Sequence, residues 1–448
     1  MGSEAARTDK HYPAHVSAMC ERHDRALEAA GADWVAIPSG SEKIAFLDDR
    51  TYPFIPNPHF VAWLPLTEHP GSAVVYRRGK RPLLLYLQPR DFWHMPPAEP
   101  AGVWVDNVDV RTVTDAAGLA AELPGDRDAG MVIGEVGEGP WHGIGRVNPE
   151  AALNLLHNAR TRKTAYELAC MRLAQRRAVA GHRAAHAAFA AGESEYGIQM
   201  AYLGAMKQRE CEMPYNNIVA LNEHAAVLHY QHLGRAAPPE SRSFLIDAGA
   251  TCAGYAADIT RSYAAAPGVF ADLLAAMEAL QLEIVAAVRA GADYRSLHLD
   301  THRRLARVLV DADLASGSVD ALVERRVTYA FFPHGLGHFL GVQVHDVGGL
   351  ASGDRAHRID RPEGHDALRL TRRLEADQVL TIEPGLYFIP MLLDELRNGD
   401  AAGHLRWDNV EALLPYGGIR IEDNVRVLAD GCENLTRDAF AEDRSLAA

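Results

Sequence analysis

The sequence has few cysteines, no long apolar segment and no basic excess. Its cysteines, Cys20, Cys170, Cys211, Cys252 and Cys432, are scattered and form no C-x-x-C pair. This spacing argues against a disulfide framework and against a thiolate metal site. No apolar run approaches the ~18 residues that a membrane span needs, and residues 1–10 lack the apolar core of a secretory signal. We therefore expect a cytoplasmic protein without a membrane partner.

The charge balance is acidic. Lys and Arg number 45 against 59 Asp and Glu, which gives a formal net charge of −14. An acidic surface repels a phosphate backbone, so no nucleic-acid partner is expected. The composition is 48% hydrophobic and 23% charged, as in ordinary globular proteins. At about 150 residues per domain, 448 residues predict two or three domains.

The first 150 residues mix short strand patterns with turn signals. Residues 71–76 and 81–87 predict two strands joined by a Gly-Lys turn. Residues 52–65 are rich in proline and aromatics, and they predict an ordered loop rather than a helix. Asn148 is expected to cap a helix with Pro149 at its first position, and Thr164 is expected to cap a longer helix. We place the domain boundary near residue 160, with one domain over 1–160 and another over 161–448.

In the second domain, acidic residues follow or interrupt apolar strand patterns. Asp247 and Asp258 are separated by a glycine-containing turn, so a hairpin can bring their carboxylates face to face. Glu383 follows the apolar residues 379–382, and Glu422 alternates with Arg420 on one face of a predicted strand. Unpaired charges within apolar strands are costly, so four such acids together indicate a shared counter-charge.

A glycine-rich segment over residues 331–345 contains His334, His338 and His345. Glycines allow a backbone to approach a ligand closely. Four carboxylates and an imidazole without a thiolate form a hard oxygen and nitrogen set that suits Mn²⁺, Co²⁺, Fe²⁺ or Zn²⁺. Four carboxylates balance the charge of two divalent ions, so the set favours a dinuclear site that holds a bridging hydroxide and polarises a carbonyl.

Other patterns predict structure rather than chemistry. His298 and His302 are four residues apart on a predicted helix without a nearby third ligand, which indicates a solvated helix face. Apolar residues from Leu273 to Val288 keep helical spacing, and Gly291 is expected to end that helix. The sequence contains no H-E-x-x-H, P-loop or G-x-S-x-G motif.

Five stretches in the second domain resemble the pita-bread metallopeptidases, and among them the prolidases (Xaa-Pro dipeptidases). They are residues 245–250, 254–261, 333–338, 381–387 and 418–424. Residues 46–49, 56–65 and 90–94 are weaker matches to the bacterial prolidase branch that includes organophosphorus acid anhydrolases. The resemblance implies an α/β (α+β) chain with an N-terminal mixed α/β domain. A C-terminal pita-bread domain of the creatinase and aminopeptidase type would follow it.

The resemblance also implies an activity. A hydroxide that bridges two metal ions, with Mn²⁺ the expected metal, would attack the amide before proline in Xaa-Pro dipeptides. An Xaa-Pro aminopeptidase acting on longer peptides and an organophosphorus acid anhydrolase are the alternatives within this fold. A binding module that has lost its metal ligands is disfavoured because the ligand positions are intact. The resemblance further implies a homodimer with the N-terminal domain at its interface.

Specific roles follow from the same resemblance. Asp258 and Glu422 would bridge the two ions, Asp247 would hold one ion, and His338 with Glu383 would hold the other. Glu383 would also shuttle the proton. The resemblance also implies that His229 and His345 stabilise the oxyanion. His334 and Arg420 would line the pocket for proline, and Tyr215 the pocket for the first residue. Arg369 would bind the substrate carboxylate, and Asp49 (or Asp48) of a neighbouring subunit would bind the free amine.

Overall fold

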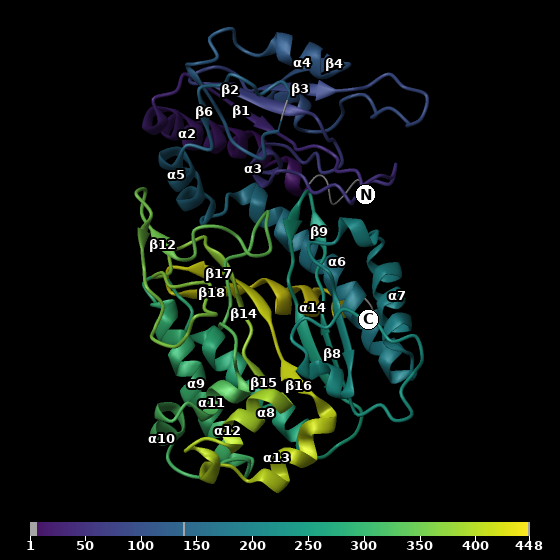
Figure 1. The fold of residues 1–448 in the computed structure, drawn as a ribbon, viewed down its shortest axis with the longest axis vertical. Helices are drawn as coiled ribbons and strands as arrows, with labels where there is room; N and C mark the ends of the chain where they lie inside the picture. Colours follow the sequence, from purple (N-terminus) through teal and green to yellow (C-terminus); the bar gives the residue numbers. More distant parts are fainter. Residues whose placement is uncertain (1–6, 138, 447–448) are drawn as a thin grey trace. The chain divides into compact units, whose positions relative to one another are not determined.

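The computed structural model describes residues 7–137 and 139–446. The chain forms two compact units (Figure 1). The N-terminal unit comprises Met1–Cys170 with the short segments Cys252–Tyr255 and Ser352–His357. The C-terminal unit comprises Met171–Thr251, Ala256–Ala351 and Arg358–Ala448.

A six-stranded mixed sheet forms the centre of the N-terminal unit, in the order β4-β3-β2-β1-β5-β6. Strand β1 is buried along its whole length, pairing antiparallel with β2 and parallel with β5. The two strands predicted from residues 71–87 are present as the antiparallel pair β2 and β3. The strands are β1 (Trp34–Pro38), β2 (Ala73–Arg77), β3 (Leu83–Leu87), β4 (Asp109–Val113), β5 (Gly130–Val132) and β6 (Arg146–Val147).

The helices of the N-terminal unit correct two expectations. Helix α3 (Pro58–Trp63) lies within the segment expected to be a loop, because the Asn57 side chain accepts a hydrogen bond from the His59 amide at 3.0 Å and Pro58 starts the turn. Asn148 does not cap a helix, since its side chain hydrogen-bonds both backbone groups of Gly134. The other helices are α2 (Tyr12–Ala30), η1 (Val105–Asn107), α4 (Ala116–Glu122) and α5 (Glu150–Arg160).

The long helix α6 (Ala165–Ala190) begins where it was predicted. The Thr164 hydroxyl accepts a hydrogen bond from the Glu167 amide at 3.3 Å. The Glu167 carboxylate in turn accepts one from the Thr164 amide at 2.7 Å. This reciprocal capping box satisfies two backbone donors that would otherwise be left unpaired at the helix start.

Small antiparallel sheets form the strand layer of the C-terminal unit, in the orders β11-β8-β7, β14-β17-β18 and β15-β16. An isolated bridge between Thr260 and Glu422 connects the first group to the segment that follows β16. The strands are β7 (Ile218–Leu221), β8 (Ser243–Asp247), β11 (Thr260–Ala264), β14 (Val379–Ile382), β15 (Gly385–Tyr387), β16 (Gly418–Arg420), β17 (Asp423–Leu428) and β18 (Gly431–Asn434). Short pairs join β9 (Thr251–Cys252) to β10 (Tyr255–Ala256) and β12 (Ala351–Ser352) to β13 (His357–Arg358).

Helices pack beside these sheets, and α8 (Val269–Ala286) and α11 (Val327–Phe331) contact β16 and β15 (Figure 1). The predicted apolar stripe of α8 is buried, from Leu273 to Ile284. Helix α8 ends at Ala286, so the expectation that Gly291 ends it was wrong; Gly291 lies in the following turn. The remaining helices are α7 (Glu195–Met206), α9 (Tyr294–Asp311), α10 (Val319–Glu324), α12 (Pro390–Arg397), α13 (Trp407–Leu413), α14 (Leu435–Leu446), η2 (Glu210–Glu212), η3 (Asn222–Ala226), η4 (Ala402–His404) and η5 (Leu414–Tyr416).

Candidate metal centre

Strand register brings the predicted acids together. Asp247 ends β8 and pairs with Thr260 of β11, and Thr260 also bridges to Glu422. Asp258 lies two residues before Thr260, in the connection that leads into β11 rather than within a strand. Because alternate residues share a face, this register directs Asp258 to the side on which Asp247 and Glu422 lie.

Three of the predicted ligands form the tightest group. Asp258, His338 and Glu422 are buried, and each offers one ligand atom such that these atoms all lie within 4.8 Å of one another. The His338 Nε2 atom is 3.4 Å from Asp258 Oδ2 and 3.6 Å from Glu383 Oε1. Glu383 therefore lies next to the group through His338.

The backbone around His338 fixes the direction of its ring. Its Nδ1 atom lies 2.9 Å from the Phe339 carbonyl oxygen, so an Nδ1–H donates there and leaves Nε2 free for a ligand. The His338 amide donates to the Thr381 hydroxyl at 3.1 Å. Gly337 precedes it with φ of +156°, and a Cβ there would lie 2.3 Å from the Thr381 carbonyl oxygen. Only glycine fits at this close approach.

The electrostatics of the acids fit a bound cation. Burial raises the pKa of Glu383 to about 7. It also raises the pKa of Glu422 well above its usual range, where repulsion from Asp258 adds to the effect. Burial raises the pKa of Asp247 even though Arg420 opposes that rise. Buried carboxylates that repel one another need positive charge, and an oxygen-rich set with one imidazole suits hard divalent ions.

A hydrogen-bonded network surrounds the outer side of Asp247. One carboxylate oxygen accepts a hydrogen bond from the Arg420 guanidinium at 2.6 Å, and the other accepts one from the Tyr215 hydroxyl at 2.7 Å. A second Arg420 nitrogen donates to the Tyr387 hydroxyl at 2.8 Å, and His334 Nε2 lies 2.9 Å from that same hydroxyl. The structure thus brings the predicted pocket residues His334, Arg420 and Tyr215 together with Asp247.

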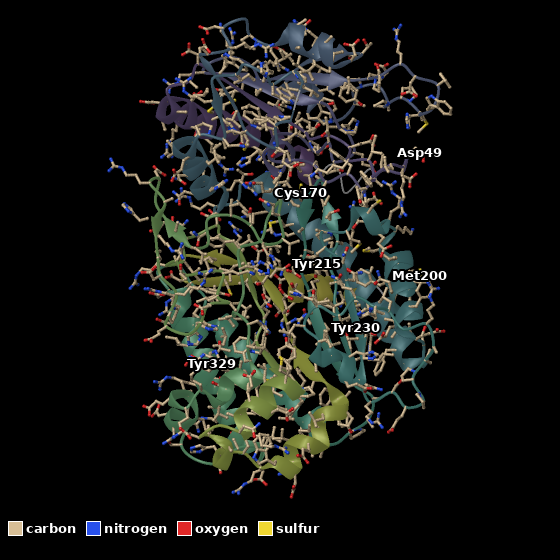
Figure 2. All side chains as sticks on the ribbon, in the orientation of Figure 1. Asp49, Cys170, Met200, Tyr215, Tyr230 and Tyr329 are labelled. Atoms are coloured by element: carbon tan, nitrogen blue, oxygen red, sulfur yellow. The ribbon has the colours of Figure 1, made fainter. Side chains whose placement is uncertain are left out.

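Other predicted residues lie at exposed positions. The exposed His345 ring meets the His338 ring edge to face at a centroid distance of 4.4 Å. His229 lies in the exposed segment after η3, and Arg369 is exposed near the end of the 359–370 segment. Although part of this residue reaches solvent, desolvation of its ring is the largest of the effects that lower the pKa of His345 to about 4, and the charges of His338 and Arg369 add to it. Asp49 is exposed in the N-terminal unit (Figure 2).

Sequence reasoning missed the polar residues that hold the acids in place. The Thr260 hydroxyl donates to Glu422 at 2.7 Å, and Asn424 accepts a hydrogen bond from the Asp258 amide at 2.9 Å. Tyr387 joins Arg420 to His334, as described above. These residues lie within or beside the stretches that carried the resemblance, and that proximity is the only signal that could have selected them.

The expectation for His298 and His302 was wrong. Both side chains are 1% exposed, and they pack against Phe332 and His365 rather than facing solvent. Polar residues at helical spacing look the same in the sequence whether their face is solvated or covered by a distant segment. Here the covering segment contains His365, which follows both histidines by more than sixty residues.

Two family models match the chain. One, described as the N-terminal domain of Xaa-Pro dipeptidase, covers residues 10–158. The other, described as metallopeptidase family M24, covers residues 169–429. The chain belongs to metallopeptidase family M24. The predicted pita-bread fold and the prediction of a metallopeptidase are thereby confirmed, and members of this family depend on metal ions.

Relatives in the M24 family match nearly the whole chain. A protein named Xaa-Pro dipeptidase from Xanthomonas campestris pv. campestris (strain B100) is 51% identical over 432 residues, covering 96% of this chain and 98% of that protein. A protein of the same name from Stenotrophomonas maltophilia (strain K279a) is 48% identical over 434 residues, covering 96% and 97%.

Solved structures share the fold. Aminopeptidase PepP of Pseudomonas aeruginosa has a TM-score of 0.70 and 22% identity, covering 96% of this chain and 99% of that chain. Zinc-substituted aminopeptidase P of Escherichia coli in complex with product also has a TM-score of 0.70 and 22% identity, covering 96% and 98%. At this identity the two structures establish the shared fold alone. Within residues 7–137 and 139–446, no helix is long and apolar enough to cross a membrane.

The close approach at Gly337 generates a prediction. Gly337→Ala would force a methyl group against the Thr381 carbonyl and hydroxyl, so His338 would be displaced from the acids. We expect this variant to lose most of its bound divalent metal, measured by elemental analysis after dialysis. Gly204→Ala in α7 is the control, because a Cβ there meets nothing within 4 Å. Normal metal content in Gly337→Ala would contradict the assigned role of this glycine.

Proposed function

We propose that this chain is a dinuclear Xaa-Pro dipeptidase. The supporting observation is the buried group of Asp258, His338 and Glu422, whose ligand atoms lie within 4.8 Å of one another. Full-length identity of about one half to curated proteins named Xaa-Pro dipeptidase supports the substrate class. The proposed metal ligands are Asp247, Asp258, His338, Glu383 and Glu422.

The placement of the ligands supports the roles that we propose for them. Asp258 and Glu422 offer ligand atoms within 4.8 Å of each other and of His338, and they are proposed to bridge the two ions. Asp247 is proposed to hold one ion, and His338 with Glu383 the other, in line with the 3.6 Å between them. A pair of divalent ions supplies an activated water at neutral pH and polarises the scissile carbonyl. We propose Mn²⁺ because the donor set is dominated by carboxylate oxygen, with Co²⁺, Fe²⁺ and Zn²⁺ as competitors.

Residues of the chain supply the proton transfer and the charge stabilisation. Glu383 is the proposed proton shuttle, since its two carboxylate oxygens lie 3.6 Å from His338 Nε2 and 3.8 Å from His334 Nδ1. His345 is proposed to stabilise the developing oxyanion, because its ring meets that of His338 at the exposed side. His229 is proposed to assist His345.

The substrate is proposed to lie between the network around Asp247 and the exposed Arg369. His334 and Arg420, joined through the Tyr387 hydroxyl, would form the wall that receives the proline ring. Tyr215 would line the pocket of the first residue. Arg369 would pair with the carboxylate of the dipeptide and so exclude longer peptides.

A homodimer is the proposed assembly. The N-terminal unit exposes large apolar side chains, among them Phe46, Leu47, Phe92 and Trp93, each at least 78% exposed. Large apolar side chains at such exposed positions support an interface with a second copy. Asp49, in the same segment as Phe46, is proposed to bind the free amine at the site of a second copy. Sedimentation of the purified chain as a monomer at micromolar concentration would contradict this assembly.

We further propose the domain extents 1–160 for the dimerisation domain and 161–448 for the catalytic domain. We also propose a reducing, cytoplasmic location, in line with the lack of a disulfide among the described residues.

The activity is tested with a Xaa-Pro dipeptide beside a Xaa-Pro-Xaa tripeptide. Each is assayed after chelation and again after Mn²⁺ is restored. We expect hydrolysis of the dipeptide alone, abolished by the chelator and recovered with Mn²⁺. Equal or faster cleavage of the tripeptide would favour an aminopeptidase instead. Failure to cleave either peptide with metal bound, together with hydrolysis of a phosphotriester, would favour an organophosphorus acid anhydrolase.

The length selection is tested through Arg369. Arg369→Ala removes the proposed partner of the substrate carboxylate, and a hydrogen bond between charged groups contributes about 1.5–3 kcal/mol. We therefore expect kcat/KM for the dipeptide to fall by about 10- to 100-fold, with a smaller change for the tripeptide. Arg358→Ala, at an exposed arginine of the same unit, is the matched control. An equal loss on both peptides would remove Arg369 as the length gauge.

A further inference from the structure

A second cluster of metal-binding side chains lies outside the candidate centre. His298 and His302 lie one turn apart on α9, and His365 comes from the 359–370 segment. All three are buried, and each offers a ring nitrogen such that the three atoms lie within 4.8 Å of one another. Tyr329, which borders this cluster, lies well apart from Tyr215 in Figure 2. We propose that the three histidines bind a Zn²⁺ ion, with water as its fourth ligand.

Hydrogen bonds orient two of the histidine rings so that one nitrogen of each ring remains available to a metal ion. His302 Nδ1 lies 2.9 Å from the Thr328 hydroxyl, which leaves its Nε2 atom for an ion. The Tyr329 hydroxyl hydrogen-bonds His365 Nε2, which leaves Nδ1 of that ring facing His298. The His298 Nε2 and His365 Nδ1 atoms are 2.7 Å apart. Two rings are thus oriented by hydroxyl groups, as metal-ligating histidines commonly are.

The distances require only a small adjustment. Tetrahedral Zn²⁺ with Zn–N bonds of 2.0–2.1 Å separates its nitrogen ligands by about 3.3 Å. The 2.7 Å contact between His298 and His365 is shorter than this separation, and the 4.8 Å limit of the cluster is longer. Binding of an ion therefore requires rotation of the rings that widens the separation between His298 and His365. Within the described residues, His298 Nδ1 is buried and makes no hydrogen bond, so the hydrogen bonding of the cluster is incomplete.

The protonation state favours ligation. Burial lowers the pKa of His298 to about 2 and that of His302 to about 3, so both rings are neutral at physiological pH. Metal ions bind the neutral imidazole, so no proton has to be displaced from these two rings. The Arg326 guanidinium lies 3.8 Å from the centroid of the Tyr329 ring, and its positive charge adds to the burial that lowers the pKa values of His302 and His365.

The donor set also predicts which metal binds. Three imidazoles without a carboxylate favour Zn²⁺ over Mn²⁺, whereas the carboxylate-rich centre accepts Mn²⁺. Glu363, Gly364 and Asp366, which flank His365, are exposed, so the segment that covers the cluster lies at the surface. The bound ion would fasten the 359–370 segment to α9. Arg369, the proposed carboxylate-binding residue, lies on this segment and would be positioned by the ion.

The experiment uses the full-length protein, stripped by chelation and then reconstituted with excess Mn²⁺ and a stoichiometric amount of Zn²⁺. Metal content is measured after dialysis in the wild type, His365→Gln and His302→Gln. We expect the wild type to retain one Zn²⁺ more than either variant, with equal Mn²⁺ in all three. His357→Gln, at an exposed histidine, is the control and should retain the Zn²⁺.

The zinc coordination and the Mn²⁺ content distinguish a specific loss of Zn²⁺ from misfolding of a variant. X-ray absorption at the zinc edge should show three imidazole nitrogens at about 2.0–2.1 Å in the wild type. A normal Mn²⁺ content in a variant shows that it has folded and that the catalytic centre is intact, so a loss of Zn²⁺ is then specific. Equal Zn²⁺ in the wild type and both variants, or a zinc shell dominated by oxygen, would overturn the proposal. Dipeptidase activity is not part of either readout.

Discussion

The repulsion between buried carboxylates is the constraint on which the rest of the C-terminal unit depends. Asp247, Asp258, Glu383 and Glu422 meet where little solvent screens them, and burial raises the pKa of Asp247, Glu383 and Glu422. Arg420 and His338 supply positive charge or hydrogen bonds, but they do not lower these three pKa values to the usual range. A pair of divalent cations balances the four negative charges, so the site fits the metal dependence of the M24 family.

The fold holds these groups together through a few shared positions. Thr260 pairs with Asp247 across the β8–β11 register, bridges to Glu422 in the backbone and also donates its hydroxyl to that carboxylate. Thr381 has a similar double function. Its hydroxyl accepts a hydrogen bond from the His338 amide and donates one to Glu383 at 3.3 Å. Short hydroxyl side chains in the strands therefore orient the longer acidic ones. The N-terminal unit has a core of its own around its six-stranded sheet.

The sequence predicted the acids and the histidine of the site, but not the residues that hydrogen-bond to them and hold them in place. Acids at the ends of apolar strands and a histidine among glycines are local patterns, and the structure brings Asp258, His338 and Glu422 together. Tyr387 and Asn424 were not selected, because the residue type of a tyrosine or asparagine in a strand does not mark it as a support for the acids until its partners are known. The burial of His298 and His302 was missed for the same reason: the segment that covers them comes from far along the chain.

Local rules also limited the prediction of helices. Helix α3 was not predicted because its six residues lie in a proline-rich segment. Asn57 and Pro58 together are nevertheless a good helix start. Asn148 has the residue type of a cap, but its side chain pairs with the backbone of Gly134 instead. At α3 a capping contact outweighed the segment's average preference for a loop. At Asn148 a tertiary contact outweighed the preference of asparagine for capping a helix.

The most direct test of this account is the anomalous scattering of a crystal grown with Mn²⁺ and measured at the manganese edge. The account predicts two peaks about 3.5–4 Å apart, the spacing of two-metal sites, with Asp258 and Glu422 contacting both. A single peak would contradict the dinuclear centre. Peaks elsewhere in the chain, with these carboxylates left without metal, would contradict the account as a whole.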